Sequence, residues 1–188
     1  MTMMPGGHPA GQEPARRLFF AIWPDEAARA RLAAAVREFV PPGAGRPQRP
    51  DQWHLTLEFL GDVPESRLPV VLDAGAAASG GACACELVLD QIEHWKRPQV
   101  LCLAAGSIPE ALAALVHSLR SELQLRGFAP ETRPFRAHLT LARKFRRAPS
   151  LGAVEPVRWP VRGFSLVQSV TEPSGSRYLE LAAWPAGA

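Results

Sequence analysis

His54-Leu55-Thr56-Leu57 and His138-Leu139-Thr140-Leu141 are two copies of one tetrapeptide in a single chain. In a β-strand, side chains two residues apart point to the same face, about 7 Å apart along the chain. Each copy therefore predicts a strand that presents an imidazole and a hydroxyl on one face and buries two leucines on the other. One copy is an ordinary strand sequence, whereas two copies in matching surroundings indicate a shared function.

The surroundings match because each motif closes a similar unit. An apolar run, a helical pattern and the first motif fill residues 18–57, and the same order fills residues 100–141. This repetition predicts two related lobes whose motif strands face a shared cleft. Periodicity and turn residues predict helices over about 25–40, 65–79 and 107–127. They predict strands at about 17–23, 53–60, 85–89, 100–104, 161–170 and 178–184, besides the second motif.

Composition sets the class of protein. With 47% hydrophobic and 21% charged residues, the 188-residue chain is expected to fold. We expect a tail over residues 1–15 that is disordered and rich in Gly and Pro, followed by a single bilobal domain over residues 16–185. A net charge of +3 tolerates a polyanionic substrate without requiring one.

Cysteine use and hydropathy predict the compartment. The cysteines, Cys83, Cys85 and Cys102, are odd in number and lack the spacing of a disulfide scaffold or a zinc site. The chain shows neither a signal peptide nor an apolar run near the ~20 residues of a membrane span. We therefore expect a cytoplasmic protein that contacts no membrane.

Two histidines across a cleft predict acid–base chemistry. Histidine has an ordinary pKa of about 6.5, so one imidazole can take a proton from water while the other gives one to a leaving oxygen. In-line displacement at phosphorus needs both, and a threonine beside each histidine can donate to a phosphoryl oxygen. A metal site is not indicated, because Glu58 could share the His54 face only at about 13 Å. We expect no metal and no cofactor.

The two motifs and their flanks resemble the two-histidine (2H) phosphoesterases, and among them the bacterial RNA 2′,3′-cyclic phosphodiesterases, also called 2′-5′ RNA ligases. The matching segments are RLFFAIWP at 17–24, WHLTLEFLG at 53–61, PFRAHLTLAR at 134–143 and FSLVQS at 164–169. The resemblance implies an α+β fold with two pseudo-symmetric lobes, antiparallel sheets lining a central cleft, and helices outside. It also implies metal-independent hydrolysis of a terminal 2′,3′-cyclic phosphate to a 2′-phosphate.

The resemblance also implies roles for individual residues. His54 would donate a proton to the leaving 3′-oxygen, and His138 would activate water. Thr56 and Thr140 would hold the phosphate. Arg143 is a further phosphate-contact candidate, although strand alternation places it opposite His138 unless the strand twists or ends.

Other activities remain open at this point. The same site could join a 2′,3′-cyclic phosphate to a 5′-hydroxyl, or act on a small cyclic nucleotide instead of an RNA end. A non-catalytic RNA-binding module would keep the basic side chains but would not need two histidines. We expect the protein to act as a monomer.

Overall fold

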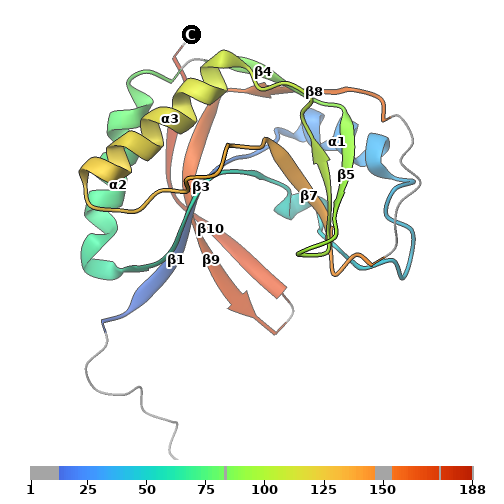
Figure 1. The fold of residues 1–188 in the computed structure, drawn as a ribbon, viewed down its shortest axis with the longest axis horizontal. Coiled ribbons are helices and arrows are strands. Elements are labelled where there is room, and N and C mark those ends of the chain that lie inside the picture. Colours follow the sequence, from blue (N-terminus) through green and yellow to red (C-terminus); the bar gives the residue numbers. More distant parts are fainter. Residues whose placement is uncertain (1–12, 83, 147–153, 174, 188) are drawn as a thin grey trace, which may run out of the picture.

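The computed structural model describes residues 13–82, 84–146, 154–173 and 175–187. Its strands form antiparallel pairs in three sheets, and together with the helices they confirm the predicted α+β class (Figure 1). The first sheet has the order β10-β9-β1-β3, with bounds Gly175–Pro185, Gly163–Glu172, Ala15–Ile22 and Leu55–Pro64. The second has the order β2-β7-β6-β5, with bounds Arg46–Pro47, His138–Arg143, Val100–Ala104 and Gln91–Trp95. The third pairs β4 (Cys85–Leu89) with β8 (Val157–Val161).

The two large sheets each combine strands from both halves of the chain. β1 pairs with β3 on one side and with β9 on the other, so the C-terminal hairpin β9–β10 completes the sheet that carries the first motif. Conversely, the short strand β2 belongs to the first half of the chain but pairs with β7, which carries the second motif. The two lobes are therefore not two independent halves of the sequence.

In the part of the chain that the structure describes, three α-helices lie outside the sheets: α1 (Glu26–Val36), α2 (Leu68–Ser79) and α3 (Glu110–Leu125). Helices α2 and α3 lie side by side over the first sheet (Figure 1). The approach of α2 to β10 is close, since a Cβ on Gly75 would lie 2.5 Å from the Trp184 ring. Helix α1 lies at the other lobe, where Arg31 donates to the carbonyl of Arg158 on β8 at 3.0 Å.

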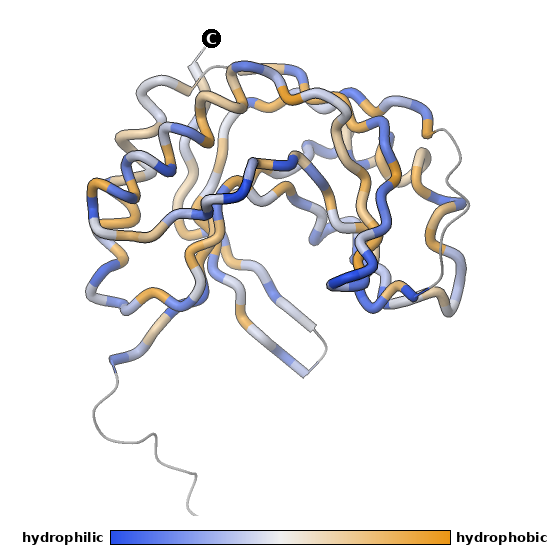
Figure 2. Tube along the Cα trace, in the orientation of Figure 1, coloured by the Kyte–Doolittle hydropathy of each residue, from blue (hydrophilic) through white to orange (hydrophobic). Residues whose placement is uncertain are grey.

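One hydrophobic core joins the two lobes. The motif leucines, Leu55, Leu57, Leu139 and Leu141, are all buried in it, which confirms their predicted orientation. The tube coloured by hydropathy shows apolar segments along the strands and polar ones at the turns (Figure 2). None of the helices that the structure describes is long and apolar enough to cross a membrane.

The structure corrects several predicted boundaries. Helix α1 ends at Val36 rather than near residue 40, because Pro41 and Pro42 disfavour helical backbone before them. A 3-10 turn, η2 (Glu65–Arg67), precedes α2, and another, η1 (Pro50–Gln52), precedes the first motif. Helix α3 starts after Pro109 instead of at residue 107, because Pro109 itself is extended.

Strands β2, β5 and β8 were not predicted. Strands β5 and β8 are short apolar alternations beside turns. Residues 1–12 of the expected tail and Cys83 lie outside the described residues. Of the last tail positions, Glu13 accepts hydrogen bonds from Ser66, and β1 starts at Ala15. Cys85 and Cys102 are free thiols.

Candidate active site

A β-bulge follows the threonine in each motif strand. Along β3, Thr56 pairs with Ala21 and Glu58 with Phe20, so that Leu57 is the extra residue. A bulge inserts one residue against the partner strand and reverses the alternation of faces beyond it. The same shift occurs at Leu141 in β7, where Thr140 pairs with Cys102 and Ala142 with Leu101.

The bulges decide which side chains share the histidine faces. Leu141 and Ala142 are both buried, so Arg143 returns to the face of His138 and Thr140. Simple alternation would have placed Arg143 on the opposite face, and the bulge is the physical reason that it does not. On β3, the same shift sends Glu58 to the buried face, which corrects the idea that it could share the His54 face.

Both histidines make the same backbone hydrogen bond. His54 Nδ1 lies 2.8 Å from the carbonyl oxygen of Gln52, and His138 Nδ1 lies 2.7 Å from that of Arg136. A carbonyl can only accept, so each Nδ1 carries a hydrogen and each Nε2 is left for the substrate. In its neutral form each imidazole can therefore act as a base through Nε2, and in its charged form as an acid through the same atom.

Aromatic rings enclose His54. Its ring centroid lies 5.0 Å from Phe19, 5.1 Å from Trp23 and 4.8 Å from Tyr178, which comes from β10. Burial lowers the pKa of His54 to about 4, and the positive charges of Arg143 and His138 also act to lower it.

Around His138, by contrast, Trp95, Glu93 and Arg136 form a hydrogen-bonded network. Its ring lies 4.5 Å from that of Trp95, and the Trp95 indole donates to Glu93 at 2.6 Å. Arg136 Nη2 donates to both carboxylate oxygens of Glu93, at 2.6 and 2.8 Å, and the Arg136 carbonyl accepts from His138 Nδ1. Burial lowers the pKa of His138 as well, while the bond to Arg136 and the negative charge of Glu93 raise it.

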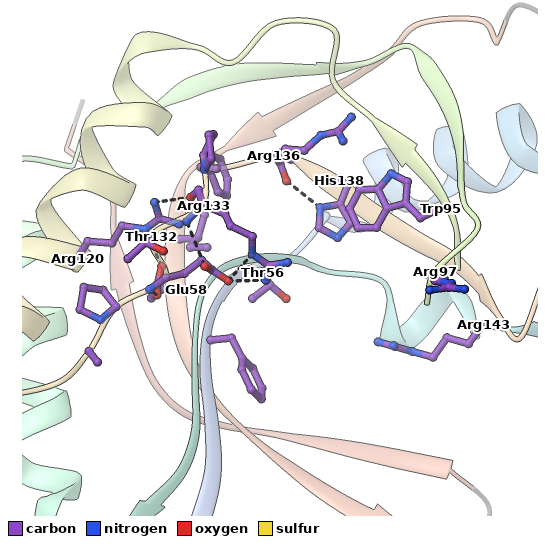
Figure 3. A pocket seen from close by; sticks show the side chains of 17 residues that line it. Thr56, Glu58, Trp95, Arg97, Arg120, Thr132, Arg133, Arg136, His138 and Arg143 are labelled. Carbon is purple, nitrogen blue, oxygen red and sulfur yellow. Dashed lines mark hydrogen bonds and ion pairs between the residues drawn. The ribbon is translucent and has the colours of Figure 1, made fainter. Parts of the chain in front are cut away.

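An open cleft of about 1190 Å³ lies between the lobes, and Thr56, His138 and Arg143 line it (Figure 3). His54 and Thr140 do not line the cleft itself. Both are partly exposed, and each lies two residues from a lining residue on the same strand face. The structure thus brings the five predicted site residues to one region, three of them directly at the cleft.

One wall of the cleft is the loop of residues 129–136, and a buried ion pair holds it in place. Glu58, whose side chain is 0% exposed, accepts from Arg120 Nε at 2.8 Å and from the backbone N–H of Glu131 at 2.6 Å. Arg120 in turn donates to the carbonyl of Arg133. Sequence reasoning missed this clamp, although an acidic residue between Leu57 and Phe59 was a signal that Glu58 has a buried partner.

Sequence reasoning also missed Trp95 and Arg136, which line the cleft beside His138. Trp95 lies on β5, a strand that was not predicted. Arg136 contacts His138 through its backbone carbonyl, and a backbone contact does not depend on the type of side chain, so the sequence does not reveal it. Among the residues that the structure describes, no three His, Cys, Asp or Glu side chains come together as metal ligands.

The repeated fold and the paired histidine strands define a two-histidine phosphoesterase. A family model described as LigT like Phosphoesterase matches residues 22–102 and again residues 103–178, one motif in each segment, and the chain belongs to this family. The predicted family is thereby confirmed.

Similar proteins support the same family. An RNA 2′,3′-cyclic phosphodiesterase of Escherichia coli K12 is 36% identical over 166 residues, which cover 84% of this chain and 84% of that protein. A protein of the same name from Thermus thermophilus is 34% identical over 174 residues, which cover 88% of this chain and 87% of that one. The crystal structure of E. coli LigT complexed with 3′-AMP has a TM-score of 0.81 at 30% identity, and covers 93% of this chain and 99% of that chain.

Proposed function

We propose that this protein is an RNA 2′,3′-cyclic phosphodiesterase that hydrolyses a terminal 2′,3′-cyclic phosphate to a 2′-phosphomonoester. The observation that carries the proposal is the matched pair of imidazoles, each with Nδ1 bonded to a carbonyl and with Nε2 unbonded among the described residues. The names of the E. coli and T. thermophilus relatives support the substrate and the reaction.

In this mechanism, neutral His138 takes a proton from water through Nε2 while the water oxygen bonds to phosphorus. The bond from phosphorus to the 3′-oxygen breaks on the opposite side, and His54 Nε2 gives its proton to that oxygen. The two histidines end with exchanged protonation states, and exchange with solvent restores them. Each acid or base contributes about 10²–10⁴-fold to the rate.

The donor role places a demand on His54. Its pKa of about 4 in the free protein leaves it neutral near pH 7, with no proton on Nε2. The negative charge of a bound cyclic phosphate favours the charged imidazole and raises this pKa. If His54 is the proton donor, as the family resemblance implies, then His54 must become protonated when the substrate binds.

Three further side chains would hold the phosphate. Thr56 and Thr140 can donate hydroxyl hydrogens to its non-bridging oxygens, and Arg143 can neutralise charge that develops there. Replacing Thr56 with Val should reduce kcat/KM by about 10–100-fold, because a hydrogen bond to a charged group contributes about 1.5–3 kcal/mol. The roles of these three residues are part of the proposal.

The test uses a short RNA with a 2′,3′-cyclic phosphate end, in excess EDTA, with wild type, His54→Ala and His138→Ala. His117→Ala is the matched control, because His117 is exposed on α3 outside the cleft lining. We expect wild type and the control to yield a 2′-phosphate, and both motif variants to lose activity by at least about 10²-fold. Activity that survives in both motif variants would contradict the proposal.

The same assay separates the alternative activities. Adding an RNA with a 5′-hydroxyl end would reveal 2′-5′ ligation, in which that hydroxyl replaces water. If the motif variants bind RNA as wild type does while wild type has no turnover, the protein is a binding module. A monomeric state and a cytoplasmic location stay predictions from the sequence.

A further inference from the structure

Basic side chains that have no partner among the described residues gather at one corner of the molecule. Most described Lys and Arg side chains form an ion pair, a hydrogen bond or a ring contact, as Arg120, Arg133 and Arg136 do in the cleft. Among the residues that the structure describes, most of the Lys and Arg side chains without any such contact lie in three neighbouring segments. The six basic side chains of these segments are exposed, and we call them the basic corner: Arg46, Lys96, Arg97, Arg143, Lys144 and Arg146.

The three segments of the basic corner are held together by the sheet. Arg143 at the end of β7 pairs with Arg46 of β2 on one side and with Val100 of β6 on the other. The turn between β5 and β6 carries Lys96 and Arg97, and it is a polar tip of the second lobe in Figure 2.

Buried contacts fix the end of this corner. Phe145 is 1% exposed; its N–H donates to Gln99 at 2.9 Å, and its carbonyl accepts from His94 Nε2 at 2.9 Å. Gly45 approaches the same segment so closely that a Cβ there would lie 2.9 Å from the Arg143 carbonyl. The charges are therefore brought together by the fold, and no acidic side chain among the described residues pairs with them.

The basic corner is continuous with the cleft. Arg97 and Arg143 belong both to the corner and to the cleft lining, and they lie near each other beyond Trp95 in Figure 3. Lys96, Lys144 and Arg146 extend the positive charge outward from these two arginines. The other arginines of the cleft are engaged with carboxylates, so this is the direction in which a polyanion meets uncompensated charge.

We infer that the basic corner binds the phosphodiester backbone of the RNA strand on the 5′ side of the cyclic phosphate end. The inference rests on the proposed function and extends it, because it predicts a preference for oligoribonucleotides over a cyclic mononucleotide. A mononucleotide 2′,3′-cyclic phosphate has no second phosphate to reach the corner. An oligonucleotide has one phosphate per linkage, and each contact with Lys or Arg releases counterions.

The test compares a 2′,3′-cyclic mononucleotide with a ten-residue RNA that ends in a 2′,3′-cyclic phosphate. The variant Lys96→Gln/Lys144→Gln removes two charges outside the cleft lining, and Lys96→Arg/Lys144→Arg keeps them. Arg37→Gln/Arg162→Gln removes two exposed charges that also lack partners among the described residues but lie outside the corner. For each, kcat/KM is measured between about 50 and 300 mM salt, with the melting temperature as a check of folding.

We expect the Gln variant to lose about tenfold in kcat/KM for the RNA near 0.1 M salt, with the mononucleotide unchanged. The slope of log kcat/KM against log salt should fall by about 1.4 for the RNA, because each contact with a single strand contributes about 0.7. The Arg variant and the control should behave as wild type.

The inference is wrong if the RNA is unaffected, if the control loses as much, or if both substrates fall together. Equal losses in the control would mean that overall charge matters rather than this corner. If wild type hydrolyses neither substrate, the proposed function fails instead.

Discussion

Removal of the Glu58 carboxylate should both destabilise the protein and disturb the cleft. Glu58→Ala leaves the Arg120 guanidinium and the Glu131 N–H without their buried acceptor. Breaking a buried ion pair from one side costs about 3–5 kcal/mol, but Arg120 is 21% exposed and keeps some water, so we expect about 2–3 kcal/mol. For a chain of this size, that lowers Tm by about 5–10 °C.

Thermal and urea unfolding followed by circular dichroism would measure this loss. Glu86→Ala is the matched control, because it breaks the exposed strand-to-strand pair of Glu86 with Arg158 and should cost less than about 1 kcal/mol. The clamp holds the loop that leads to Arg136, so kcat/KM should fall with Glu58→Ala and not with the control. A loss no larger than that of the control would refute the clamp, as would additive effects of Glu58→Ala and Arg120→Met in a double-mutant cycle.

Three further predictions concern the site. Burial holds the pKa of His54 at about 4 in the folded protein, below the value of about 6.5 in the unfolded chain. The free energy of unfolding should therefore not depend on His54 above about pH 6.5 and should fall as the pH drops from there toward 4. His54→Asn should flatten this dependence of Tm on pH. Arg143→Ala should lower kcat/KM for any cyclic phosphate by about 10²-fold or more, with an unchanged Tm, because it removes one charge from the phosphate site. Glu93→Gln should move the acidic limb of the kcat profile, which reports the enzyme–substrate complex, to lower pH, because the charge of Glu93 raises the pKa of His138; a profile that coincides with that of Glu86→Gln would contradict this role.

The sequence alone predicted the parts of the site that depend on short repeats. The leucines of both motifs point into the core, and both motif strands reach the cleft region, as strand periodicity requires. Periodicity could not place Arg143 or Glu58, because each follows a bulge whose position depends on the partner strand. The sequence of a strand does not reliably reveal where a bulge will form. Strand alternation therefore predicted the wrong face for the residues after Leu57 and Leu141.

The electrostatic difference between the two histidines also depends on contacts distant in sequence. The two motifs are identical, so local sequence assigns both imidazoles the same properties. Tyr178 beside His54 lies on β10, and Glu93 beside His138 lies on β5, and both residues are distant in sequence from the motif that they contact. Such neighbours follow from topology, which a pattern of apolar residues constrains only loosely.

The shared construction of the first sheet bears on how the protein is made. Strand β1 is central in that sheet, and one of its edges is covered by β9, which the ribosome produces about 140 residues after β1. Until then, a nascent chain holds a highly apolar strand with an unpaired edge, the kind of surface that promotes aggregation. A chain truncated before residue 163 would carry both histidines yet lack this cover and the ring of Tyr178, so incomplete translation products are expected to need chaperones or to be degraded.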